Sequence, residues 1–348
     1  MKRYIDAILL EARIQSENLK KQQMRMSSVY IGGGTPTCLP YNLLRTMLTG
    51  ILESFPPDIN TEITIESNPG TIDYKNLKYL RDSGVTRLSI GIQSLKDDLL
   101  LRLHRTHSVS DSLNAFSIAR DVGFTNINVD LIYGIPDQTM KDWQETLDAV
   151  LKLAPEHISA YGLMIEEGTP LWSSVNSGLE IPCNEDLQTD MYYFTKDRLE
   201  AEGYRHYEIS NFALPGYECR HNMVYWQLRP YIGLGAGAHS YINNVRRSNL
   251  LDPLIYSDSI LNSGGAVQER ERFSKADEMS TAVIMQLRTA QGVEEEEFKK
   301  RFGIAMYGVF SDAIEKGTAR KLLEWNKGRL RLTRYGLMLS NEAMKEFL

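Results

Sequence analysis

Cysteine is scarce in this chain. Its 348 residues contain only Cys38, Cys183 and Cys219, and no two of them form a CxxC pair. Three widely spaced cysteines exclude a disulfide framework, so the sequence indicates a protein of a reducing compartment. Cys38 is expected to be a small buried residue, as free cysteines often are.

Long apolar runs and an excess of basic charge are also missing. No stretch approaches the roughly 20 apolar residues that cross a bilayer, and the first residues lack the apolar centre of a secretion signal. The formal net charge of −6 gives no general attraction to nucleic-acid phosphates. We therefore expect a cytoplasmic protein without a membrane span. The basic string NKGRLRLTR is more simply a solvated turn than a nucleic-acid contact.

Short β-branched runs alternate with longer amphipathic segments over the first half of the chain. After an opening helix, strands are predicted at 28–31, 62–66, 87–92, 126–132 and 157–163. Helices are predicted between them, at 39–54, 74–83, 110–122 and 140–153. Repeated βα units predict an α/β fold with a parallel sheet, either doubly wound or closed toward a barrel.

Unusual residues follow each predicted strand. The successive carboxyl ends read GGGTPT, ESNPG, GIQS, DLIYGIP and MIEEGTP. Parallel sheets bind their ligands at the carboxyl ends of the strands, so these residues are expected to gather around a ligand. Taken singly, each glycine or proline could merely punctuate a loop. Five such ends in succession favour the ligand site.

The glycine turn itself restricts the ligand. Gly-Gly-Gly-Thr at 32–35 exposes backbone N–H and C=O groups at close range, which suits a ligand with a carboxylate and an ammonium group. A phosphate is the rival ligand. The turn lacks the lysine of a P-loop and the GxGxxG spacing of a dinucleotide site, so both nucleotide interpretations are weak.

The second half of the chain has a different pattern. A long helix is predicted at 185–202, with β-like pieces at 204–212 and 231–241. From about Arg270 the sequence predicts two helices, then a hairpin that pairs 322–325 with 329–332, and a last helix. This order is typical of a small winged-helix-like module.

The motifs together resemble one family. GGGTPT, IESNPG, LSIGIQS, LHRTHS, NVDLIYGIPDQT and AYGLMIEEGTPL follow one another as in the radical S-adenosylmethionine (SAM) proteins related to oxygen-independent coproporphyrinogen III oxidase. Within that family, CRHNMVYWQLRPYIGLGAGAHSY carries the HNxxYW signature of the HemW branch of haem chaperones. The likeness covers nearly all of the chain.

This resemblance implies a fold and a domain order. We expect a partial, TIM-like (β/α) radical SAM barrel that lacks its first strand over residues 1–170. A barrel extension with the HNxxYW motif is expected over 171–265, and a HemN-type helical and winged module over 266–348.

The resemblance also implies ligand-binding residues. Gly33, Gly34 and Thr35 would receive the amino-acid end of SAM. The other residues implied around SAM are Glu66, Gln93, Arg105, Asp130, Met164 and His239. Arg105 can hold a carboxylate, and Asp130 in an apolar strand must be either paired or functional, because an unpaired buried charge is costly. A purely structural role remains the alternative for each of them.

Radical SAM chemistry uses a 4Fe–4S cluster, held by three thiolates of a CxxxCxxC loop after the first barrel strand. The printed sequence has no such loop, so we predict neither a cluster ligand nor a catalytic residue. The chain starts with the helix that would follow that strand. A shortened chain, a misassigned start and a natural variant without the cluster all stay open. Strand 28–31 is then expected to have an unpaired edge, with lowered stability or self-association.

The HNxxYW segment is the candidate haem site. His221 offers an imidazole beside Tyr225 and Trp226, whose rings can pack on a porphyrin. The alternative is a structural motif in which His221 and Asn222 hydrogen-bond a loop while Tyr225 and Trp226 fill the core. His239 could serve either ligand. We expect a chaperone that binds haem and SAM and passes haem to an acceptor apoprotein. The alternative function is a coproporphyrinogen III oxidase-like enzyme, whose radical chemistry the chain as written could not perform.

Overall fold

The computed structural model describes residues 1–21 and 24–348, which form two compact units. The barrel unit consists of Ser28–Pro40 and Glu62–Glu218. The terminal unit combines Met1–Ser27, Tyr41–Thr61 and Cys219–Leu348. Each unit is described by itself.

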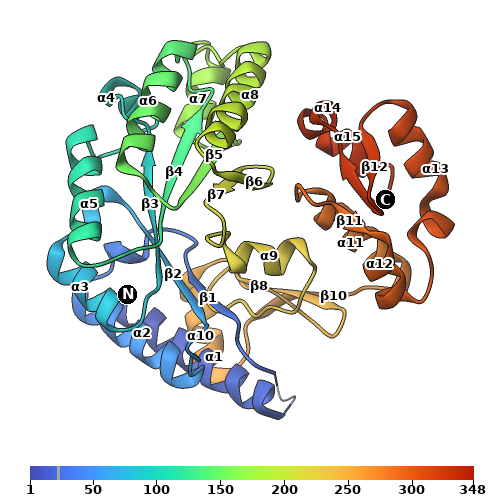
Figure 1. The fold of residues 1–348 in the computed structure, drawn as a ribbon. Helices are drawn as coiled ribbons and strands as arrows, with labels where there is room; N and C mark the ends of the chain where they lie inside the picture. Colours follow the sequence, from blue (N-terminus) through green and yellow to red (C-terminus); the bar gives the residue numbers. More distant parts are fainter. Residues whose placement is uncertain (22–23) are drawn as a thin grey trace. The chain divides into compact units, whose positions relative to one another are not determined.

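A curled seven-stranded sheet forms the barrel unit (Figure 1). Its strands are β1 (Ser28–Ile31), β2 (Glu62–Ser67), β3 (Arg87–Gln93), β4 (Ile127–Tyr133), β5 (His157–Gly162), β6 (Arg205–Glu208) and β7 (Asn211–Ala213). The order is β1-β2-β3-β4-β5-β7-β6; the first five strands are parallel, and β7 is antiparallel to β5. The α/β half-barrel predicted from the sequence is confirmed, and all five predicted strands lie within about two residues of their expected bounds.

Helices cover the outer face of this sheet (Figure 1). They are α3 (Tyr74–Asp82), α4 (Asp97–Arg102), α5 (Val109–Asp121), α6 (Met140–Leu153), α7 (Pro170–Asn176) and α8 (Glu185–Ala201). Ser108 and Thr139 begin α5 and α6 with capping boxes, in which the side chains satisfy backbone N–H groups of the first turn. Trp143 of α6 is fully buried and donates its indole N–H to Thr195 of α8 at 2.8 Å.

The two faces of the sheet differ in polarity. Leu88, Ile90 and Val129 point to the helices and are fully buried. Successive strand residues point to opposite faces, so the residues between them line the concave side. There the parallel register places Glu66, Ser89, Asn128 and His157 in one row. The sequence thus forms an apolar outer face and a polar inner one.

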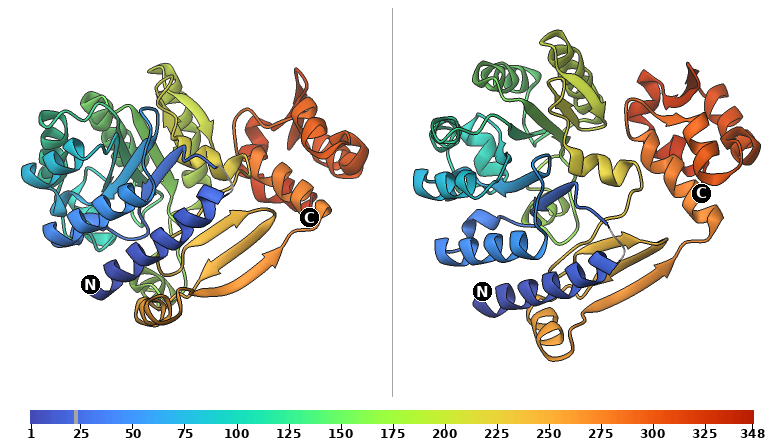
Figure 2. Two further views of the ribbon diagram at one scale, coloured as in Figure 1. Left: turned by 90° about the horizontal axis from the view of Figure 1, so that it is seen from below. Right: turned by 60° about the horizontal axis from the view of Figure 1, so that its bottom comes forward.

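The terminal unit contains the opening helix. Its first elements are α1 (Lys2–Lys21), α2 (Tyr41–Ser54), α9 (Arg220–Trp226), β8 (His239–Ile242), β9 (Val245–Asn249), α10 (Pro253–Ser263) and β10 (Val267–Arg272). Helix α1 packs along α10 and beside the sheet β10-β9-β8 (Figure 2). Glu11 of α1 is buried and accepts hydrogen bonds from Gly235 N, Asn249 Nδ2 and Tyr256 OH at 2.9, 2.8 and 2.6 Å.

The C-terminal part of this unit has the predicted winged arrangement. It runs α11 (Lys275–Leu287), β11 (Val293–Glu294), α12 (Glu295–Phe302), α13 (Met306–Ala319), β12 (Leu323–Asn326), β13 (Arg329–Leu332), α14 (Arg334–Met338) and α15 (Ser340–Lys345). The β12–β13 hairpin turns at Lys327 and Gly328, whose φ angles are 51° and 79°. The sequence predicted two helices before the hairpin and one after it, whereas the structure has α11, α12 and α13 before it and two short helices after it.

Three details of the sequence analysis were wrong. The 231–241 segment contains only a bridge between Tyr231 and Tyr241 before β8 begins at His239. Four helices, α4, α7, α9 and α10, were not predicted. Cys38 is exposed, because Thr37 takes the inward position of the short turn Pro36–Cys38 and its Oγ1 lies 2.6 Å from that of Thr71.

Within residues 1–21 and 24–348, no helix combines the length and hydrophobicity of a membrane span.

Candidate functional site

The glycine turn follows β1 and lies against Glu66. Tyr30 OH donates to Glu66 Oε1 at 2.8 Å, and the Gly33 N–H donates to Oε2 at 3.2 Å. A Cβ on Gly32 would lie 2.6 Å from the carboxyl carbon of Glu66. Gly32 is therefore required for the carboxylate to approach the turn.

Gly33 and Gly34 have a different reason to be glycine. Their φ angles are +83° and +149°, which side-chain-bearing residues rarely adopt. A Cβ built on either meets nothing within 4 Å, so the protein leaves this space open. Thr35 follows, half-buried, and the turn presents bare backbone to whatever occupies the space. This open cradle fits the amino-acid end of SAM expected there.

Two carboxylates share the concave face. Burial raises the pKa of Glu66 above 4.5, and the nearby charge of Asp130 raises it further, while the hydrogen bonds from Tyr30 and Gly33 oppose the shift. Burial likewise raises the pKa of Asp130. Each ionised carboxylate makes ionisation of the other more costly, so the pair favours a positively charged ligand.

Asp130 is held as a hydrogen-bond acceptor by its neighbours. Ser89 Oγ donates to its Oδ2 at 2.9 Å, and Asn128 Nδ2 donates to its Oδ1 at 2.8 Å. The same Asn128 amide donates to Ser89 Oγ at 2.7 Å. Both donors come from the inward positions of β3 and β4, which fixes the carboxylate on the polar face of the sheet.

A buried histidine sets the orientation of Asn128. His157 Nδ1 lies 2.5 Å from Asn128 Oδ1, and its Nε2 lies 2.8 Å from Tyr207 OH. The amide oxygen can only accept, so His157 donates from Nδ1 and accepts from Tyr207 at Nε2. Burial lowers the pKa of His157 well below its usual value, which keeps this neutral tautomer. Each group in this hydrogen-bond chain therefore donates toward Asp130: Tyr207 to His157, His157 to Asn128, and Asn128 to Asp130.

Arg105 supplies an unpartnered cation. Its Nε is buried and has no hydrogen-bond partner within the described part of the chain. Burial lowers the pKa of Arg105, and the charge of Asp130 raises it. An enclosed N–H of a half-buried guanidinium is costly without a partner, and an anionic group would supply one. Arg105 therefore fits the carboxylate of an amino-acid ligand.

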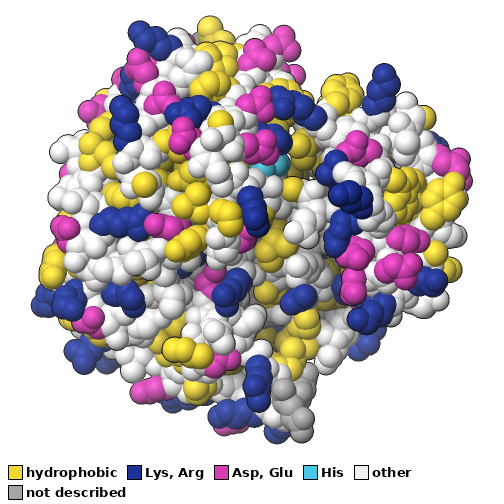
Figure 3. Space-filling model, viewed as in Figure 1, with side chains coloured by type: hydrophobic (Ala, Val, Ile, Leu, Met, Phe, Trp, Pro, Cys, Tyr) yellow, Lys and Arg dark blue, Asp and Glu magenta, His cyan; other side chains and the backbone are white. Residues whose placement is uncertain are grey.

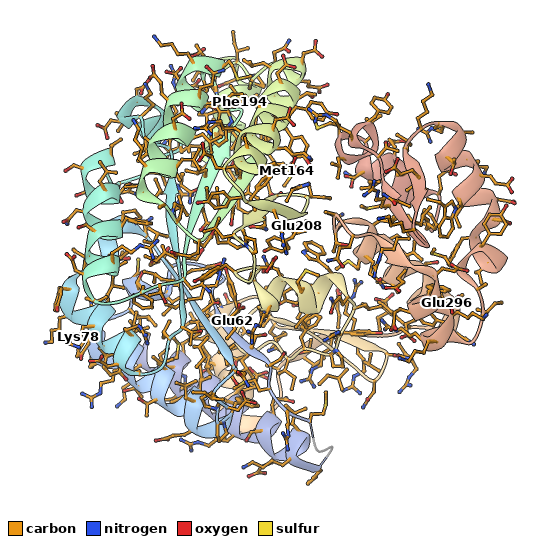
Figure 4. All side chains as sticks on the ribbon, in the orientation of Figure 1. Glu62, Lys78, Met164, Phe194, Glu208 and Glu296 are labelled. Carbon is orange, nitrogen blue, oxygen red and sulfur yellow. The ribbon has the colours of Figure 1, made fainter. Side chains whose placement is uncertain are left out.

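The remaining predicted residues are placed as follows. Gln93 has a φ of 67° at a register shift near the end of β3, and its amide folds back over Gly91, whose Cβ would lie 2.8 Å from Gln93 Nε2. Met164 follows β5 and is 78% exposed (Figure 4). His239 is exposed on β8 of the terminal unit. The structure thus brings together Gly33, Glu66, Asp130 and Arg105 in the barrel unit.

Sequence reasoning missed the supporting residues. Tyr30, Ser89, Asn128, His157 and Tyr207 form the hydrogen bonds that hold the two carboxylates. A signal was available, because polar residues at alternate positions of a buried strand must face a polar space.

The haem candidate lies in the terminal unit. The HNxxYW motif forms α9, in which the i, i+4 spacing puts His221 and Tyr225 on one face. Their rings meet edge to face at 5.0 Å, and His221 Nε2 lies 2.9 Å from Tyr225 OH. Tyr225 in turn packs on Tyr231 at 4.6 Å.

The aromatic residues of α9 are partly enclosed. Tyr225 and Trp226 are half-buried. Trp226 Nε1 is enclosed and has no hydrogen-bond partner among the described residues, and Arg288 lies over the ring at 5.8 Å. The haem site and the structural motif therefore both stay predictions for this segment.

The donor set for an iron–sulfur cluster is not found. All three cysteines are free, and no group of three or more His, Cys, Asp or Glu side chains in residues 1–21 and 24–348 is placed to hold a metal ion. These residues therefore do not fit such a cluster.

Comparisons with known proteins agree with this geometry. The family model of the radical SAM superfamily matches residues 6–150, and that of the HemN C-terminal domain matches residues 273–339. The solved structure of coproporphyrinogen III oxidase (HemN) from Escherichia coli, described as a radical SAM enzyme, has a TM-score of 0.85 at 22% identity. The match covers 99% of this chain and 82% of that one. The fold is therefore that of a radical SAM protein.

The curated relatives narrow the family. "Heme chaperone HemW" of Bacillus subtilis (strain 168) is 33% identical, over 99% of this chain and 91% of that protein. The protein of that name from Lactococcus lactis is 34% identical, over 99% of this chain and 89% of the relative. That of Mycobacterium tuberculosis (H37Rv) is 32% identical, over 98% and 85%. The chain belongs to the HemW family of haem chaperones.

Proposed function

We propose that this protein binds SAM at the carboxyl edge of the half-barrel and haem beside His221, and that it hands haem to an acceptor apoprotein in the cytoplasm. The observation that carries the SAM part is the open cradle at Gly33 and Gly34, flanked by Glu66 and by the unpartnered Arg105. The haem part rests on the half-exposed α9 face and on the names of the relatives.

The charges of the cradle match the ends of SAM. Glu66 and Asp130 present two desolvated carboxylates, which the ammonium and sulfonium charges of SAM would relieve. Arg105 would take the carboxylate of the same ligand, because hydrogen bonds between guanidinium and carboxylate are charge-assisted. The bound cation would lower the pKa values that burial has raised. Gln93, Met164 and His239 remain in the proposal as further contacts.

Haem would be held through its iron by His221. Its Nε2 faces Tyr225 OH in the structure, so iron ligation at that nitrogen requires the tyrosine to turn away. Radical SAM proteins use a 4Fe–4S cluster to cleave SAM. No residue described in this chain is assigned to that cluster, and the proposed haem transfer involves no step at it.

The haem site is tested by titrating haem into three proteins. In wild type, iron ligation shifts the Soret band; His221→Ala is expected to lose that shift and to weaken binding about ten-fold or more. Tyr225→Phe keeps the ring but removes the hydroxyl that faces Nε2, so it should bind haem at least as tightly as wild type. His104→Asn, at an exposed histidine that the proposal does not use, serves as the histidine control. Equal spectra and affinities for wild type and His221→Ala would remove His221 from the site.

A further inference from the structure

A pocket lies in the terminal unit, and its lining includes none of the residues assigned above to SAM or haem. Its volume is about 480 Å³, within the size range of small-molecule sites. The end of α1 and one face of the sheet β8–β10 line it. Four cations line this pocket: Lys21, Arg247, Arg270 and Arg272.

Two of these arginines oppose each other across the strands. Arg270 of β10 is the direct register partner of Arg247 of β9, and Ser240 of β8 completes the row. Like charges directly opposite each other destabilise a sheet. Neither guanidinium has a hydrogen bond or an ion pair with any residue that the structure describes. This arrangement is costly in the unliganded protein.

On the other face of the same sheet, an arginine is paired with an acidic residue. Arg246, the neighbour of Arg247, pairs with Glu271 at 2.9 Å directly across the strands. The acidic residues of β10 therefore point away from the pocket, while its arginines point into it. Figure 3 shows acidic and basic side chains interspersed on the face drawn there, in contrast with this single-sign row.

The charge of one acidic residue, Glu11, acts on Arg247. Burial lowers the pKa of Arg247, and Glu11 raises it while Arg270 lowers it further. Glu11 is nevertheless committed elsewhere, because its two oxygens accept from Gly235 N, Asn249 Nδ2 and Tyr256 OH. Glu11 thus reduces the repulsion without supplying a partner.

The rest of the pocket wall is mixed. Its apolar residues are Leu19, Ile232, Ile242 and Val245, and its uncharged polar residues are Gln15, Asn18, Ser240 and Asn243. An anion whose body is apolar would fill such a space and place its charged groups at the guanidinium fork, which matches both carboxylate and phosphate geometry.

We propose that this pocket is a second ligand site, for a small molecule that carries carboxylate or phosphate groups on an apolar body. The site goes beyond the proposed function, because it uses neither His221 nor the glycine turn. The propionates of haem and the phosphates of a nucleotide are two sources of this chemistry.

The experiment titrates four probes: haem, haem dimethyl ester, ATP and inorganic phosphate. Each is added to wild type, Arg247→Gln, Arg270→Gln and the control Arg246→Gln, which removes the same charge from the opposite face of β9. We expect at least one anionic probe to bind Arg247→Gln and Arg270→Gln about ten-fold or more weakly than Arg246→Gln, since each variant loses a charge-assisted hydrogen bond. If the two variants bind haem more weakly than Arg246→Gln but bind its dimethyl ester equally well, the site recognises carboxylates. If they bind ATP more weakly, the site recognises phosphates.

Folding is controlled by melting the ligand-free variants. Arg270 is exposed, so Arg270→Gln should melt at or above the wild-type temperature because a like-charge contact is removed, whereas Arg246→Gln loses an ion pair. If every anionic probe binds Arg270→Gln as tightly as Arg246→Gln, the site does not exist. We expect the arginine variants to leave the spectrum of the haem iron unchanged. A failure of iron ligation at His221 is therefore distinguished from a failure of the second site.

Discussion

Asn128→Ala breaks the hydrogen-bond chain that orients Asp130. Asn128 is buried and contacts Ser89, Asp130, His157 and Ser159 through 2.7, 2.8, 2.5 and 3.1 Å hydrogen bonds. Truncation leaves the buried His157 N–H without its acceptor and takes one donor from the Asp130 carboxylate.

The size of the effect follows from these two losses. An orphaned buried donor costs about 1–3 kcal/mol, and a hydrogen bond to a charged group contributes about 1.5–3 kcal/mol. We expect Asn128→Ala to lose about 3 kcal/mol of stability, which lowers the melting temperature of the barrel unit by about 6–12 °C. Its affinity for SAM should fall about ten-fold, since Asp130 loses the Asn128 donor and keeps those of Ser89 and Ser159.

Asn126→Ala is the matched control for this prediction. Asn126 precedes β4, and its side-chain oxygen is buried without a hydrogen-bond partner among the described residues. Removing it should change stability by about 0.5 kcal/mol or less. Thermal unfolding followed by circular dichroism and calorimetric SAM titration measure both variants. If Asn128→Ala melts and binds like Asn126→Ala, the chain from Tyr207 to Asp130 has no role.

Three further predictions concern the glycine turn and Glu66. Gly32→Ala places a Cβ 2.6 Å from the Glu66 carboxyl group, so calorimetry should show SAM binding weakened about ten-fold with a melting temperature lowered by only a few degrees. Gly34→Ala is strained at φ +149°, so its free energy of unfolding in chemical denaturation should fall by about 1–3 kcal/mol, and SAM binding should be lost as well. A variant as stable as wild type would contradict the backbone conformation at Gly34. Glu66→Gln tests the raised pKa: a carboxyl whose folded pKa exceeds its unfolded value of about 4.5 destabilises the fold as pH rises through that window. The melting temperature of Glu66→Gln relative to wild type should therefore rise from pH 4.5 upward, and a constant difference rejects the shift.

The sequence predicts the parallel α/β sheet well because its strands are short, β-branched and separated by amphipathic helices, whereas the partial barrel came from the family resemblance. It failed at α9, where Arg220–Trp226 contains β-branched and aromatic residues and no apolar stripe. Helix α10 had a usable signal: Asp252 accepts from the N–H groups of Leu254 and Ile255, and Pro253 occupies the first turn. That cap was overlooked.

The candidate site was predictable only where a residue was anomalous by itself. Asp130 and Glu66 are carboxylates in apolar strands, and the three glycines are conspicuous in any sequence. The partners of Asp130 come from neighbouring strands, so they depend on a register that one sequence does not reveal. Ser89, Asn128 and His157 are ordinary polar residues until that register aligns them.

The most direct test of the central claim compares SAM with its decarboxylated analogue, which lacks only the carboxylate. Both are titrated calorimetrically into wild type and Arg105→Gln. We predict that wild type binds SAM about ten-fold or more tightly than the analogue and that Arg105→Gln binds the two equally, because Arg105 holds the carboxylate. A preference for SAM that survives in Arg105→Gln, or no binding of SAM to wild type, would contradict the account.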